Sequence, residues 1–117
     1  MPAAQKNFYK KLLGKRGEDL AVKYIKKCGY KTVKRNFTTP FGEADIVAEK
    51  GDETVFIEVK TRSNDVYGEP KDAVDFKKRE KYRKIAEYYI SVNGETAVSF
   101  AVVEVTPDGV NLIERAF

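Results

Sequence analysis

The chain has 117 residues, 34% of them charged and 42% hydrophobic, and a formal net charge of +4. This length suggests one domain with an ordinary core, and the basic balance favours an anionic partner, of which nucleic acid is the commonest. The absence of histidine and the single cysteine, Cys28, exclude histidine catalysis, an internal disulfide and a cysteine zinc site, so any catalysis must use carboxylates, lysine, tyrosine or a bound ion.

The first predicted element is a helix over residues 8–28, in which apolar side chains recur at helical spacing. Gly29 follows in the position of a C-cap. Because two glycines weaken the early part, we expect the regular helix to begin near Lys15. Residues 1–6 are expected to be frayed.

Three strands are predicted next, over residues 30–38, 43–49 and 54–62. The second and third alternate apolar side chains with period two, and Gly51-Asp52 between them is a turn signal. A polar loop is predicted over residues 63–70.

A long helix over residues 71–92, ended by Asn93-Gly94, comes next, and strands over residues 97–105 and 110–113 follow it. The order α-β-β-β-α-β-β predicts one α/β domain, with a mixed sheet flanked by helices. The long helix can serve as a crossover connection, which makes the third and fourth strands parallel neighbours.

The turn between the second and third strands sets two acids against each other. If Gly51-Asp52 is a two-residue hairpin loop, counting back along both strands places Asp45 directly opposite Glu58. Strict alternation then puts four charged side chains on one face, namely Glu43, Asp45, Glu58 and Lys60. Val47 and Phe56 share this face, and the other face carries Ala44, Ile46, Ala48, Val55, Ile57 and Val59.

Two opposed carboxylates destabilise a plain sheet, because directly opposed side chains have Cβ atoms roughly 4.5–5.5 Å apart. Magnesium binds carboxylate oxygens at about 2.0–2.1 Å, so one ion can bridge Asp45 and Glu58 and remove the repulsion. Lys60, two residues along the same face, can reach a phosphate or a water at the metal. The alternative is a solvated outer face on which Lys60 neutralises Glu43.

Asp45, Glu58 and Lys60 resemble the D…(D/E)-x-K core of the PD-(D/E)XK nuclease superfamily. Further stretches resemble the YraN-like bacterial family, described as uncharacterised and endonuclease-like: residues 17–21, 35–37, 41–47 and 55–62. The loop over residues 67–70 and the residues 114–117 are similar too. The resemblance covers the chain from about Leu13 onward. The chain departs from these patterns at Ala44, where the superfamily name has proline, and at Ala101, where relatives often carry an acid.

The resemblance implies a restriction-endonuclease-like fold similar to that of archaeal Holliday-junction resolvases. It also implies Mg- or Mn-dependent hydrolysis of phosphodiester bonds, with structured or branched DNA as the candidate substrate. On this hypothesis Asp45, Glu58 and the backbone carbonyl of Val59 ligate the metal, and Lys60 orients or activates the attacking water. Glu18 would complete the site through water or a second ion, although it also fits a surface acid beside the buried stripe.

Basic residues gather in the two predicted helices. The long helix carries Lys71, Lys77, Lys78, Arg79, Lys81, Arg83 and Lys84, and the N-terminal segment adds Lys6, Lys10, Lys11, Lys15 and Arg16. Such clusters bind nucleic acid in a salt-dependent, sequence-independent way. The expected contacts, to DNA rather than RNA, are Lys77, Arg79, Arg62, Lys15 and Arg16. The alternative is a solvated helix face.

Two other functions fit the sequence: a non-catalytic nucleic-acid-binding module on the nuclease fold, and a protein-interaction domain. A homodimer is expected only by analogy with resolvases, whose branched substrates have two-fold symmetry. No segment has the ~20 apolar residues of a membrane helix, and no signal peptide is recognisable, so no membrane partner is expected and the predicted location is the cytoplasm.

Overall fold

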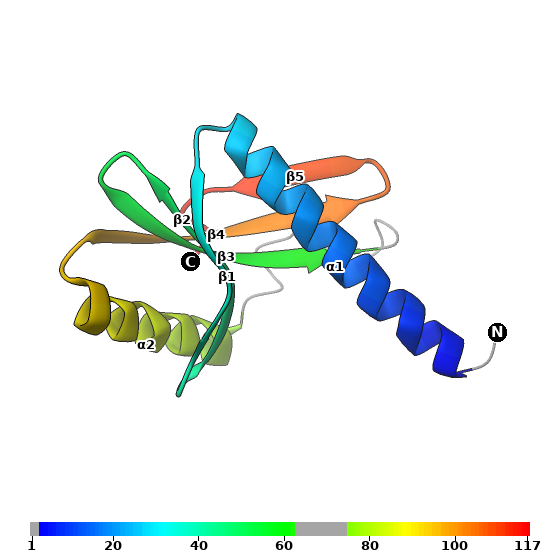
Figure 1. Cartoon of the computed structure of the whole chain (residues 1–117), viewed down its shortest axis with the longest axis horizontal. Coiled ribbons are helices and arrows are strands. Elements are labelled where there is room, and N and C mark those ends of the chain that lie inside the picture. Colours follow the sequence, from blue (N-terminus) through cyan, green and yellow to red (C-terminus); the bar gives the residue numbers. More distant parts are fainter. Residues whose placement is uncertain (1–2, 63–74) are drawn as a thin grey trace.

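The computed structural model describes residues 3–62 and 75–117, with residues 3–14 described by backbone alone. In these residues two helices and five strands follow one another (Figure 1): α1 (Ala3–Lys27), β1 (Lys31–Thr39), β2 (Gly42–Lys50), β3 (Glu53–Thr61), α2 (Phe76–Asn93), β4 (Ala97–Thr106) and β5 (Gly109–Ile113). The predicted order of helices and strands is confirmed.

The strands form one sheet in chain order, β1 to β5. Neighbouring strands are antiparallel except for β3 and β4, which are parallel because α2 crosses over between them. The β2–β3 register runs from Lys50 opposite Glu53 to Ile46 opposite Ile57, as the two-residue hairpin loop predicts. In β1 the register shifts at Val33, which leaves one unmatched residue in this edge strand.

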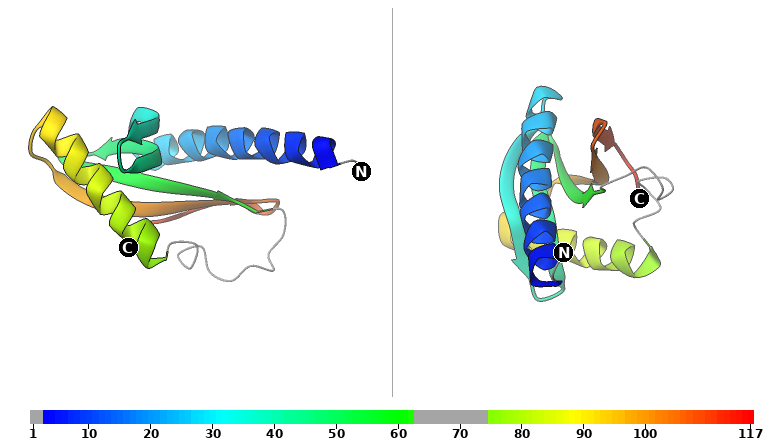
Figure 2. Two further views of the ribbon diagram at one scale, coloured as in Figure 1. Left: turned by 90° about the horizontal axis from the view of Figure 1, so that it is seen from below. Right: turned by 90° about the vertical axis from the view of Figure 1, so that its right-hand side faces the viewer.

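The two helices cover opposite faces of the sheet (Figure 2). On the α1 side, Ala21 and Ile25 pack on a buried layer that includes Ile46, Ile57 and Val103. On the α2 side, the buried residues are Ala44, Val47, Phe56, Tyr82, Ile85, Ala86 and Tyr89. The sheet is therefore buried on both faces at its centre, which explains why β3 is buried without interruption from Thr54 to Glu58.

Both helices end as predicted, but their starts differ from the prediction. Gly29 adopts a φ of 93° after α1, and the Tyr30 N–H donates to the Ile25 carbonyl at 2.9 Å. α1 begins at Ala3, ahead of the expected residue 8. The helix is thus formed well before Lys15, and the expectation of a frayed end is wrong for residues 3–6. α2 begins at Phe76, because Asp75 is its N-cap and accepts a 2.9 Å hydrogen bond from the Lys78 N–H.

The predicted loop over residues 63–70 and the predicted helix start at residue 71 lie outside the described residues. Within the described part of the chain, no helix combines the length and the apolar content needed to cross a membrane.

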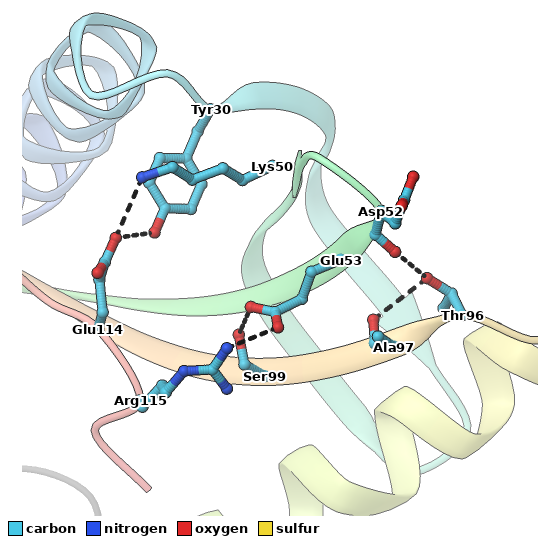
Figure 3. Close-up of polar contacts among 9 residues, drawn as sticks. All are labelled: Tyr30, Lys50, Asp52, Glu53, Thr96, Ala97, Ser99, Glu114 and Arg115. Atoms are coloured by element: carbon cyan, nitrogen blue, oxygen red, sulfur yellow. Dashed lines mark hydrogen bonds and ion pairs between the residues drawn. The ribbon is translucent and has the colours of Figure 1, made fainter.

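Polar contacts fix the residues that follow β5 to the sheet (Figure 3). The Tyr30 hydroxyl donates to the Glu114 carboxylate, and Arg115 Nη2 lies 2.8 Å from Glu53 Oε2. Ser99 Oγ donates to the other oxygen of Glu53 at 2.6 Å. These bonds hold the segment after β5 against the sheet as it runs towards α2.

The chain then ends on the α2 side of the sheet. The Ala116 N–H donates to the Phe100 carbonyl at 2.9 Å. The Phe117 ring lies 5.2 Å from the ring of Phe100 and 5.4 Å from that of Tyr82, between ring centres. Phe117 thus contacts a tyrosine of α2 that belongs to the candidate site.

Candidate active site

Strict alternation along β2 breaks down around Asp45. Ala44 and Val47, three residues apart, both pack in the α2-side cluster, whereas Ile46 packs on the α1 side. The prediction that Ala44 shares a face with Ile46 is therefore wrong. Its neighbour Glu43 is exposed, accepts a 3.3 Å hydrogen bond from Thr38 Oγ1 and is not among the residues that line the cleft described below.

The neighbouring strand β1 is irregular at the same level. Arg35 pairs with Ile46 and Phe37 with Ala44, whereas the residues between these pairs are not matched. Asn36 between them adopts a φ of 52°, a left-handed conformation that asparagine tolerates better than most residues. The paired strands are thus irregular together at the position of Asp45.

Asp45 lies just beyond Ile46 and Ile57, the last matched residues of the β2–β3 ladder. Its Oδ2 accepts a 2.7 Å hydrogen bond from the backbone N–H of Val59. The carboxylate therefore lies in the gap where β2 and β3 stop pairing, beside Glu58 on the neighbouring strand.

The carboxyl of Asp45 is electrostatically unfavourable in its ionised form. Burial raises the pKa of Asp45 to about 7, and the neighbouring charges of Glu58 and, to a lesser degree, Glu18 act in the same direction. The hydrogen bond from Val59 opposes this shift without cancelling it. A cation beside the two carboxylates would offset both the cost of burying the Asp45 charge and its repulsion by Glu58.

Glu58 has a defined partner at each oxygen. Lys78 Nζ lies 2.5 Å from Oε1, and the Tyr82 hydroxyl donates to Oε2 at 2.6 Å. Glu58 is 9% exposed and Tyr82 is fully buried. Both partners come from α2, and their spacing of four residues places them on one helix face.

The roles of Lys78 and Tyr82 in the site were not predicted from the sequence. Tyr82 is a fully buried residue of α2, and its hydroxyl also binds Glu58. The available signal was the Lys-x-x-x-Tyr spacing, which puts an ammonium and a hydroxyl on the helix face that packs against β3.

Glu18 is close to Asp45 but is bound by other side chains. Its Oε1 accepts hydrogen bonds from Arg35 Nε at 3.0 Å and Asn36 Nδ2 at 3.1 Å. The left-handed turn at Asn36 allows these two adjacent side chains to reach the same carboxylate. Glu18 thus reaches the site mainly through its charge, which contributes to the raised pKa of Asp45.

Gly17 allows α1 to approach the end of β3. A Cβ atom at this position would collide with Oγ1 of Thr61 and would lie 3.2 Å from its Cβ and Cγ2. The absence of a side chain therefore sets how closely the first helix can approach the site.

The candidate residues surround one cleft of about 850 Å³, lined by Arg16, Gly17, Glu18, Leu20, Asp45, Glu58, Val59, Lys60, Thr61, Arg62, Val105, Thr106 and Pro107. It lies at the carboxyl ends of the parallel strands β3 and β4, an edge at which α/β sheets commonly bind ligands. The cleft unites residues that are far apart in the sequence.

The basic residues predicted to contact nucleic acid divide into two groups. Arg16 is exposed and lines the cleft. Arg62 also lines it, but its side chain is only 8% exposed and its Nε lies 3.2 Å from Glu104 Oε2. Three others are exposed and lie outside the cleft lining: Lys15, Lys77 and Arg79.

The donors in the cleft suit a magnesium ion. Among the described residues, no group of three or more His, Cys, Asp or Glu side chains is arranged to hold a metal. Magnesium usually keeps several waters and binds proteins through one or two carboxylates together with substrate phosphates. This coordination preference fits the ligands available in the cleft, which are Asp45, Glu58 and the Val59 carbonyl, better than a closed site built from protein ligands would.

A family model described as "Uncharacterised protein family UPF0102" matches residues 17–105. The chain belongs to this family. The UPF0102 protein of Thermodesulfovibrio yellowstonii is 45% identical over 106 residues, which cover 90% of this chain and 95% of that protein. The UPF0102 protein of Clostridium botulinum is 40% identical over 120 residues, covering 95% and 98%.

A third relative, the UPF0102 protein of Dictyoglomus thermophilum, is 49% identical over 81 residues, which cover 69% of each chain. Membership of UPF0102 confirms the resemblance to the YraN-like family. The matched stretch begins at Gly17 and includes Asp45, Glu58, Lys60 and both α2 partners of Glu58.

Proposed function

We propose that this UPF0102 protein is a metal-dependent endonuclease that hydrolyses phosphodiester bonds in DNA, with branched or otherwise structured DNA as the substrate. The observation that carries the proposal is the pair of crowded, largely buried carboxylates, Asp45 and Glu58, at the floor of an open cleft. Two carboxylates this close together destabilise the folded sheet, and a divalent cation between them offsets the repulsion.

The ion would be held by Asp45, Glu58 and the Val59 carbonyl. Glu18, whose charge already acts on Asp45, would bind the ion through a water molecule. When bound, Mg²⁺ or Mn²⁺ supplies a Lewis acid that polarises the phosphate and lowers the pKa of a bound water. The Val59 N–H fixes Asp45, and the Tyr82 hydroxyl fixes Glu58. These second contacts orient the two carboxylates before any ligand arrives.

Lys60 and Arg16 would act on the substrate. Lys60 is exposed at the cleft, where its ammonium can orient the attacking water and stabilise the charge that grows on the phosphate. Arg16, from α1, can bind a neighbouring phosphate of the backbone. No step needs a histidine, which agrees with the composition.

The test is cleavage of labelled branched and linear DNA by the purified chain with Mg²⁺, Mn²⁺ or EDTA, with an RNA duplex alongside. We expect metal-dependent cleavage that falls at least a hundredfold in Asp45→Ala and Lys60→Ala. Glu43→Ala is the matched control, because it removes an exposed acid of the same strand. Cleavage that survives Asp45→Ala or Lys60→Ala would rule out these roles.

One observation favours a second candidate, a nucleic-acid-binding module that does no chemistry. Lys78 already neutralises Glu58, so the pair of acids is partly compensated without a metal. Titration with Mg²⁺ and Mn²⁺ separates the two: the nuclease shows a metal-linked rise in melting temperature that Asp45→Asn abolishes. A pure binder shows salt-dependent DNA binding and no such rise.

A further inference from the structure

The two oxygens of Glu58 differ in how readily their partners can be displaced by a metal ion. Tyr82 is fully buried and holds Oε2, while Lys78 holds Oε1 at 2.5 Å. The Lys78 side chain is 30% exposed, so it can leave without disturbing the core. The tyrosine, packed against Phe100 and Phe117, cannot leave so easily.

We infer that the Lys78 ammonium occupies the metal position on Glu58 in the free protein, and that it leaves this carboxylate for a substrate phosphate when a divalent cation binds. This inference rests on the proposed metal-dependent function and adds a residue that function does not require. It makes Lys78 an internal competitor of the metal and, afterwards, a contact to the substrate.

The replacement of the Lys78 ammonium by a metal ion follows from the charges of the two cations and from the length of the lysine side chain. An ammonium and a divalent cation repel each other, so both cannot lie against Oε1 at contact distance. A lysine has a flexible stem of four carbons and a compact charge, and can move by rotamer change alone. Its backbone is meanwhile fixed, because the Lys78 N–H donates to the N-cap Asp75.

A coupling between metal and nucleic acid is the consequence. The metal must displace Lys78 and therefore binds weakly to the free protein. A phosphate that accepts the released ammonium removes this penalty, so metal and DNA each strengthen the binding of the other. The protein would assemble its complete site only with the substrate present.

The test compares Mn²⁺ binding by the full chain and two variants, without nucleic acid, by calorimetry. Lys78→Met keeps the length of the stem and removes the charge, and Lys77→Met is the matched control, because Lys77 is the exposed neighbour in the same turn. We expect Lys78→Met to bind Mn²⁺ about ten-fold more tightly than wild type, and Lys77→Met to bind like wild type.

Equal or weaker binding by Lys78→Met overturns the inference but leaves the metal site standing, provided that Asp45→Asn abolishes binding. No binding by wild type or Lys78→Met overturns the proposed metal function and the inference together. If Lys78→Met fails to fold, Lys78→Gln replaces it, since the amide keeps a hydrogen-bond donor for Glu58 without a charge. Circular dichroism checks the fold of each variant.

Discussion

Asp45 illustrates how a single residue of the candidate site opposes the stability of the fold. Its pKa rises from an ordinary value of 3.8 to about 7, chiefly through burial and secondly through Glu58. The folded chain therefore holds a proton on Asp45 more tightly than the unfolded chain does. Proton binding by Asp45 therefore stabilises the folded chain fully below about pH 4. This contribution to the free energy of unfolding is lost as the pH rises through about 7.

Asp45→Asn should therefore stabilise the metal-free protein at high pH. The amide is neutral and its oxygen can still accept from Val59, so we expect a gain on the order of 2 kcal/mol at pH 8. At pH 4 the advantage should shrink, because the wild-type carboxyl is then protonated. Urea unfolding in EDTA at both pH values measures the difference. An equal difference at the two pH values would contradict the assigned ionisation of Asp45.

At the scale of elements, the fit between α1 and β3 depends on Gly17. Alanine normally favours a helix over glycine by about 1 kcal/mol. Here the added methyl would collide with Thr61, a stiff β-branched residue, and α1 would have to move away from the strand end. The collision should outweigh the helix propensity.

We therefore expect Gly17→Ala to lower the free energy of unfolding by about 1–3 kcal/mol. A double-mutant cycle with Thr61→Ala identifies the cause, because the smaller residue removes the colliding atoms. Gly17→Ala should then cost much less, or even stabilise, in the Thr61→Ala background. The same cost in both backgrounds would show that the close approach is not responsible.

The elements also show which features local sequence determines. The β2–β3 register was predictable because a two-residue loop at Gly51-Asp52 fixes which residues face each other. The parallel pairing of β3 and β4 was predictable from the crossover helix between them. Both depend on residues close together in the chain or on a general rule of topology.

The features that were not predicted depend on contacts between distant elements. The break in alternation at Ala44 is matched by an irregularity at Asn36 in another strand, which period-two counting along β2 alone does not detect. Lys78 and Tyr82 reach Glu58 only because α2 packs at a particular rotation on the sheet. The predicted helix also ran through Asp75, whereas this residue is the N-cap and α2 begins at Phe76.

At the scale of the whole molecule, the C-terminal residues pack against a residue of α2 that binds the candidate site. They lie outside residues 17–105, which the family model matches, yet Phe117 packs against Tyr82, which in turn binds Glu58. Part of the support for the site therefore comes from the opposite end of the chain to α1.

Phe117→Ala should destabilise the protein by about 1–3 kcal/mol, because it removes an aromatic contact to both Tyr82 and Phe100. Phe76→Ala is the control, since that ring is 75% exposed and its loss should change stability by no more than about 0.5 kcal/mol. Thermal unfolding of the two variants gives the comparison. Similar losses in both would mean that Phe117 contributes little to the fold.

Both outer strands of the sheet are poorly suited to pair with another copy. β5 has only five residues, and β1 carries the unmatched residue Val33 between the exposed cations Lys31 and Lys34. Short, kinked or charged outer strands discourage sheets from joining edge to edge. We therefore expect the chain to resist edge-to-edge association into fibrils at high concentration.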